Sequence, residues 1–175
     1  MTYPDRVAPA QAATTPRDGT GAAAPHPCDA NINPATGLAS DYLNHFNEAI
    51  MLLDMLATCP DCRADFLRWR PMSYREHFLA SRFKGREIAI AAYDAADPAL
   101  RARLERLAGA MTAVIEATRD ALDRDLPPPA AGRLASRAAA RLKPLVARAG
   151  GLINGDAGDE APHPPQAVVD GLMQR

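Results

Sequence analysis

Several features that define large protein classes are missing from this sequence of 175 residues. Residues 1–27 hold no apolar run of the kind found in a secretory signal. The longest apolar run, Ala49–Ala57, is interrupted by Asp54 and is far shorter than the roughly 20 residues that a membrane-spanning helix needs. We therefore expect a soluble, cytoplasmic protein.

The short motifs of several enzyme classes are also missing. The sequence contains no P-loop, no dinucleotide-binding fingerprint, no Gly-x-Ser-x-Gly elbow and no His-Glu-x-x-His helix. Three cysteines, an odd number, do not suggest the disulfide framework of a secreted domain. The net charge of −1 provides no overall field that would attract nucleic acid or an anionic membrane. No segment alternates with a period of two, so no strand is predicted.

The aromatic residues are unevenly distributed. Eight of the nine fall between Tyr42 and Tyr93, inside a longer block with helical periodicity, Leu38–Leu126. This predicts an all-α fold in which residues 35–126 form a small bundle of about four helices, one of them short. Residues 1–34 are expected to be a disordered tail. Residues 127–175 are expected to be an extension punctuated by Pro and Gly, with a semi-detached basic helix at about 131–149.

Capping signals place the helices of the predicted bundle. The first is expected over about Leu38–Ala57. Thr58–Asp61 resembles a capping box that begins a short second helix, which Pro71 ends. Ser73–Glu76 is a clearer capping box for the third helix, in which Gly85 is either tolerated or marks a break.

The last helix of the bundle has the strongest signals. Asp97 is a suitable N-cap, Pro98 is suited to the first turn, and the prolines after Leu126 end the helix. In the basic helix that follows, Pro144 should kink or shorten the helix, and Gly150–Gly151 should end it.

One stripe of the first helix carries groups that can bind metal. Asp41, His45 and Glu48 are spaced i, i+4 and i+7, and a bundle could bring His77 of the third helix toward them. Carboxylates beside imidazoles could form a metal shell or orient an acid/base. A solvated polar face with i, i+4 pairing explains the same residues. A metal ion is the only cofactor that the sequence suggests.

The pair Cys59 and Cys62 is a second candidate. The i, i+3 spacing near a helix start permits a thiol–disulfide pair or two metal thiolates, although Cys28 is the only further cysteine. Two cysteines without chemical function are the alternative.

A third candidate is a basic segment without acidic residues, which could contact nucleic acid or an anionic membrane surface. It has no aromatic side chain to stack on bases, so both partners are unexpected, and a solvated helix is the alternative. Its basic residues are Arg133, Arg137, Arg141, Lys143 and Arg148.

The turn at Pro71 is rich in the residue types that dominate protein interfaces. Such a turn could bind a protein partner, although Trp69 could equally anchor the core. The residues concerned are Arg68, Trp69, Arg70, Tyr74 and Arg75.

By exclusion, we expect a small non-enzymatic interaction module, an adaptor or regulator that binds a protein partner. The alternatives are a metal-binding or thiol-redox bundle, and an accessory protein that acts through the basic helix. Residues 49–57 are apolar around more than half of the predicted helix, which suggests burial on several sides, including by a second copy of the chain.

Overall fold

The computed structural model describes residues 31–156 apart from Ala57, Pro60, Phe83 and Asp125. This part of the chain is helical and contains no β-strand, only one isolated backbone bridge. The all-α prediction is therefore confirmed. In chain order the helices are a short 3-10 helix, η2 (Ser40–Leu43), and α1 (Asn44–Met55), α2 (Cys62–Arg68), α3 (Tyr74–Ala80), α4 (Arg86–Ala95), α5 (Pro98–Asp123) and α6 (Pro128–Asn154).

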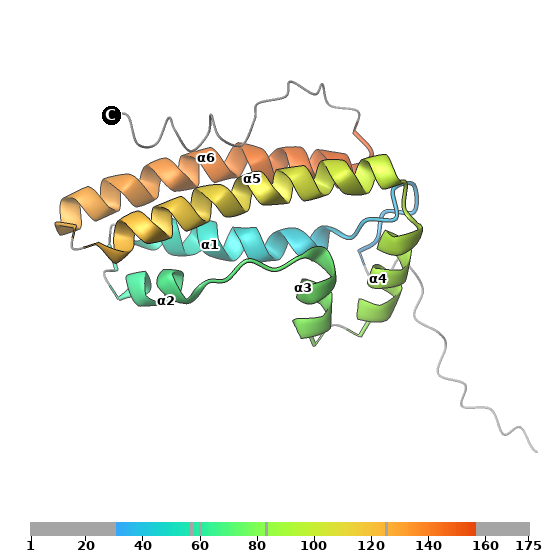
Figure 1. The fold of residues 1–175 in the computed structure, drawn as a ribbon, viewed down its shortest axis with the longest axis horizontal. Helices are drawn as coiled ribbons and strands as arrows, with labels where there is room; N and C mark the ends of the chain where they lie inside the picture. Colours follow the sequence, from blue (N-terminus) through green and yellow to red (C-terminus); the bar gives the residue numbers. More distant parts are fainter. Residues whose placement is uncertain (1–30, 57, 60, 83, 125, 157–175) are drawn as a thin grey trace, which may run out of the picture.

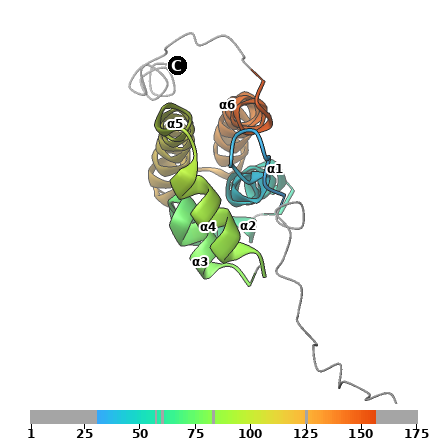
Figure 2. The same cartoon turned by 90° about the vertical axis from the view of Figure 1, so that its right-hand side faces the viewer.

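Three of these helices run side by side along the molecule (Figure 1). The two longest, α5 and α6, form an antiparallel hairpin, and α1 packs against α6. The end view shows α1 beneath α6, with the short helices α2, α3 and α4 grouped beneath α5 (Figure 2). The fourth corner of the bundle is thus made of three short helices in place of one long one.

The capping residues explain where several helices begin. Ser73 and Glu76 form both hydrogen bonds of a capping box at the start of α3. The carboxylate of Asp97 accepts hydrogen bonds from the first backbone amides of α5. The helical pattern breaks before Gly85, where α4 begins, so the alternative of a break is the one observed. The capping box predicted at Thr58–Asp61 is wrong, because α2 begins at Cys62 without a side-chain cap.

The prediction of a semi-detached C-terminal helix is wrong. Helix α6 packs along both α5 and α1, and its side chains belong to the same hydrophobic core. Ala135, Ala138 and Leu142 are fully buried. Alanines remove little apolar area from water individually, but their small size lets helices approach closely along their whole length. The boundary predicted after Leu126 therefore does not separate two cores among the described residues.

Helix α6 also runs past both of its predicted breakers. It continues through Pro144 and Gly150–Gly151 and ends at Asn154. A proline in a helix leaves the carbonyl four residues earlier without its donor, here that of Ala140. Because Pro144 and Ala140 are both exposed, water can bind that carbonyl.

The chain enters the bundle through a tight turn at residues 33–37. Residues 31–34 were predicted to belong to the tail, but Ile32 is buried in the core. The hydroxyl of Thr36 donates to the Ile153 carbonyl at 2.7 Å, which ties the turn to the end of α6. Gly37 has φ +69° and lies so close to α4 that a Cβ would be 3.0 Å from the Ala92 carbonyl oxygen. The rest of the predicted tail, residues 1–30, lies outside the described residues.

Candidate functional site

His45 is the most unusual polar residue of the core. It lies on α1, only 5% of its surface is exposed, and its Nε2 atom has no hydrogen-bond partner. The ring stacks on Trp69, with centroids 4.5 Å apart and an angle of 19° between the planes. The indole Nε1 donates to the His45 carbonyl at 3.1 Å, so the tryptophan is held by the same residue that it covers.

A series of aromatic rings continues from this stack through the bundle. The ring of His77 lies 6.1 Å from that of His45 and 5.8 Å from that of Tyr42. Tyr42 in turn contacts Tyr74, which stacks on Tyr93 with centroids 4.2 Å apart. The series links α1, α3 and α4 at the corner of the bundle that lacks a long helix, where the rings fill the core.

Burial sets the protonation state of both histidines. It is the main reason why the pKa of His45 is lowered to about 4; the neighbouring His77 lowers it further, and the Arg70 backbone acts in the opposite direction. Burial also lowers the pKa of His77, against a smaller opposing effect of Asp41. Near neutral pH both rings are therefore uncharged, which suits a place in the core better than a charged acid/base pair.

The structure brings together only part of the predicted metal site. His45 and His77 are neighbours, but Glu48 is exposed, and Asp41 accepts hydrogen bonds from the side chains of Asn31 and Asn44. Within the described residues, no group of three or more His, Cys, Asp or Glu side chains is arranged to hold a metal ion. Two neutral imidazoles without a third ligand do not form a site typical of zinc or a di-metal centre.

An open cavity of about 430 Å³ lies beside the His45–Trp69 stack. Its charged lining is balanced, with two carboxylates, Glu48 and Asp65, and two guanidinium groups. One of these, Arg68, already pairs with Asp65. The unpartnered Nε2 of His45 is not exposed to this cavity, because water cannot reach that atom. The cavity therefore gives no access to this unpartnered atom of His45.

In the turn at Pro71, which is rich in Trp, Tyr and Arg, the aromatic side chains point into the core. Trp69 and Tyr74 are 6% and 4% exposed, so neither is available as an anchor for a partner. Trp69 is a core anchor, which was the alternative interpretation of the sequence. The arginines point outward and have local partners: Arg70 donates to the Leu67 and Trp69 carbonyls at 2.8 Å, and Arg75 pairs with Asp94.

Cys59 and Cys62 are neighbours, but the thiol of Cys62 is not activated. Both Cys59 and Cys62 are free thiols, and Cys62 is buried. A hydrogen bond with Cys59, followed by burial, raises the pKa of Cys62 to about 11. A raised thiol pKa is the opposite of what a reactive thiolate at a helix start needs. Cys28 lies outside the described residues.

Four of the five basic residues of α6 share one side of that helix. At about 100° per residue they fall within an arc of about 80°. Lys143 is the exception, since it lies on the side toward α1, where its Nζ is 2.9 Å from Oδ2 of Asp54. The four that share an arc are Arg133, Arg137, Arg141 and Arg148.

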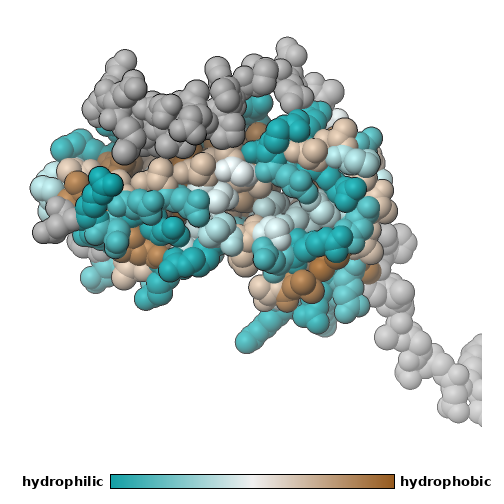
Figure 3. Space-filling view, in the orientation of Figure 1, coloured by the Kyte–Doolittle hydropathy of each residue, from teal (hydrophilic) through white to brown (hydrophobic). Residues whose placement is uncertain are grey.

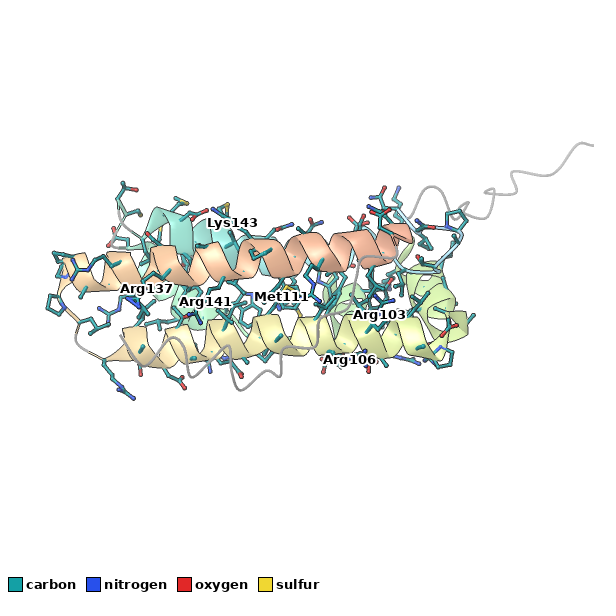
Figure 4. All side chains as sticks on the ribbon, turned by 90° about the horizontal axis from the view of Figure 1, so that it is seen from above. Arg103, Arg106, Met111, Arg137, Arg141 and Lys143 are labelled. Carbon is teal, nitrogen blue, oxygen red and sulfur yellow. The ribbon has the colours of Figure 1, made fainter. Side chains whose placement is uncertain are left out.

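Helix α5 adds two further arginines to the same side of the molecule. Figure 4 shows Arg103, Arg137 and Arg141 along the seam between α5 and α6, with Arg106 at the outer edge of α5. We call the six arginines of the two helices the arginine face: Arg103, Arg106, Arg133, Arg137, Arg141 and Arg148.

No carboxylate of α5 or α6 lies on the arginine face. Helix α6 has no acidic residue. On α5, Glu105 accepts a hydrogen bond from the Tyr93 hydroxyl at 2.6 Å, on the side toward α4. The other three acids of α5 line a cavity against α2: Glu116, Asp120 and Asp123.

The basic residues of α6 were identified from the sequence as a candidate anion-binding site, but Arg103 and Arg106 of α5 were not included. A helical projection of α5 would have found them, because both lie away from the arc of its four acids. What the sequence could not indicate is that α5 and α6 lie side by side.

Apolar side chains offer no large exposed area on the side of the molecule shown in Figure 3, which is mainly hydrophilic with small separate apolar areas. The apolar circumference of α1 is largely covered by the chain itself, although Met51 and Met55 remain 53% and 42% exposed. None of the described helices combines the length and apolarity needed to cross a bilayer.

Comparison with protein-family models, curated proteins and solved structures finds no significant match, so function has to be inferred from the residues themselves.

Proposed function

We propose that this protein is a helical interaction module that binds an acidic segment of a protein partner through the arginine face. The segregation of charge on two neighbouring helices supports this proposal most directly. Arginines line one side of the α5–α6 hairpin, and all four acids of α5 lie on its other side. A long face of one charge attracts an oppositely charged partner and determines how it binds.

The chemistry of the face favours carboxylates. A guanidinium group forms two parallel hydrogen bonds with a carboxylate, and it remains charged at all physiological pH values. The four arginines of α6 extend over about 22 Å of helix at 1.5 Å per residue. An acidic helix or an extended acidic peptide can present carboxylates over such a length.

Nucleic acid fits the same face less well. Neither α5 nor α6 has an aromatic residue on which a base could stack, and the net charge of the chain is −1. Arginine binds phosphate as readily as carboxylate, so the two partners have to be separated by experiment.

The test is binding of a fluorescent peptide of ten glutamates to the full chain, compared with a fluorescent DNA duplex of similar charge. We expect the peptide to bind more tightly, and its binding to weaken strongly with added salt. The variant Arg133→Glu/Arg137→Glu should bind the peptide at least about tenfold more weakly, because two attractive pairs of up to about 1 kcal/mol each become repulsive. Both positions are exposed, so the fold should be kept.

The matched control is Lys84→Glu/Arg86→Glu, which changes the net charge equally at exposed positions before and within α4. Equal weakening by the two variants would mean that only net charge matters, and would overturn the proposal. Tighter binding of the DNA duplex would replace it with a nucleic-acid function, and absence of binding to both probes would reject it.

A further inference from the structure

Helix α6 ends in a left-handed turn whose last described residue, Asp156, lies close to Gly151. Gly155 adopts φ +82°, a left-handed conformation that ends the helix. The amide of Asp156 then donates to the Gly151 carbonyl at 2.8 Å. A hydrogen bond of this kind closes the last helical turn.

This turn lies on the same side of α6 as the arginine face. Gly151 lies within the same arc of α6 as the four arginines, three residues beyond Arg148. A Cβ placed on Gly151 would be 3.7 Å from both Cβ and Oδ2 of Asp156. The carboxylate of Asp156 therefore lies over the end of the arginine stripe, and the chain leaves the described region at that point.

The sequence that follows is acidic. Residues 157–175, which lie outside the described part, contain three carboxylates against Arg175. Nineteen residues can extend over about 60 Å, whereas α6 with its 27 residues is about 40 Å long. The segment is therefore long enough to reach every arginine of the face. Its acidic residues are Asp159, Glu160 and Asp170.

We propose that residues 157–175 bind the arginine face of their own chain and compete there with the acidic partner. Three observations support this: the carboxylate of Asp156 lies over the arginine stripe, the segment is long enough to reach every arginine of the face, and segment and face have opposite charges. Because the segment is tethered, its effective concentration is in the millimolar range, so a weak interaction is enough for occupancy. The competition rests on the proposed function, but the binding of the segment does not.

The first test needs no partner. In the full chain, the side-chain Nε–Hε NMR signals of Arg137, Arg141 and Arg148 are compared between the wild type and Asp159→Asn/Glu160→Gln/Asp170→Asn. We expect these signals to differ between the two proteins, and the difference to vanish at about 1 M salt, where the Debye length falls to about 3 Å. Superimposable arginine signals at low salt would overturn the inference.

The second test measures affinity for the ten-glutamate peptide. The neutralised segment should increase affinity about three- to tenfold, because the internal competitor is lost. The matched control neutralises three exposed acids elsewhere, Asp61→Asn/Glu87→Gln/Asp123→Asn. An equal gain in the control would attribute the effect to net charge and overturn the competition.

The two proposals can fail separately. Arginine signals that depend on the segment, without any peptide binding, would support docking of the segment and reject the proposed partner. Peptide binding, together with arginine signals that do not depend on the segment, would support the proposed partner and reject docking of the segment.

Discussion

Acid should destabilise this protein between about pH 6.5 and pH 4 because of one buried side chain. The ring of His45 is uncharged in the core, stacks on Trp69 and has no partner for Nε2. Its pKa is lowered from 6.5 to about 4, first by burial and then by His77. In the unfolded chain the ring takes up a proton near its ordinary pKa. Because the unfolded state binds the proton first as the pH falls, stability decreases through this window and the loss levels off below it.

The expected magnitude follows from the two pKa values. Linkage between a folded pKa of about 4 and an unfolded pKa of 6.5 predicts a loss of about 2 kcal/mol at pH 5 and about 3 kcal/mol at pH 4, relative to pH 7. His77 contributes in the same direction, since burial lowers its pKa as well. For a domain of ordinary stability, such a loss is a large fraction of the free energy of unfolding.

Urea unfolding at pH 7, 5 and 4 measures this loss. The variant His45→Phe keeps an aromatic ring on Trp69 but cannot be protonated, so its stability should decrease less with acid, by about 2 kcal/mol at pH 5. An NMR titration of the His45 ring in the wild type provides an independent readout if the variant folds poorly. Parallel pH profiles of the two proteins, or a native His45 that titrates near pH 6.5, would refute the reasoning.

Three further outcomes follow from the same structure. Leu142→Ala should reduce the free energy of unfolding by about 2–5 kcal/mol in a urea titration. The control Leu79→Ala, at a 63% exposed position, should change it by less than about 0.5 kcal/mol. Similar losses in the two variants would mean that α6 is not part of the core. Asp97→Ala should cost about 1 kcal/mol in thermal unfolding through loss of the α5 cap, and an unchanged midpoint would argue against that cap. Cys62 should remain unmodified at pH 8 in the native protein during the time in which an exposed thiol reacts completely with Ellman's reagent, because its pKa is raised to about 11, and rapid modification would contradict this.

The beginnings of helices could be predicted where a side chain acts on the backbone next to it. Ser73 and Asp97 cap α3 and α5 as predicted, because the hydrogen bonds concerned span only two or three residues. Pro144 shows the limit of such local rules. Its effect depends on whether water can reach the freed carbonyl, and the tertiary fold decides that.

The packing of α6 could not be predicted for a related reason. Each alanine buries little apolar area, so an alanine-rich helix was expected to pack loosely, yet Ala135, Ala138 and Ala139 are buried. These small side chains allow the neighbouring helix to approach closely, and how closely it approaches depends on the shapes of both helices. The same dependence hid the role of His45, since a polar stripe on α1 is solvated or buried according to whether α2 and Trp69 cover it.

The charged residues on the two sides of α5 have different surroundings. On one side its acids contact neighbouring elements, as Glu105 does with Tyr93, or line the cavity against α2. On the other side Arg103 and Arg106 adjoin the arginines of α6, whereas Arg119 lies with the acids at the cavity and Arg101 lies over the ring of Tyr93. The net charge of the chain is −1, so the six arginines on one face are a local feature and not a consequence of the overall charge, as expected if the proposed partner presents carboxylates to that face.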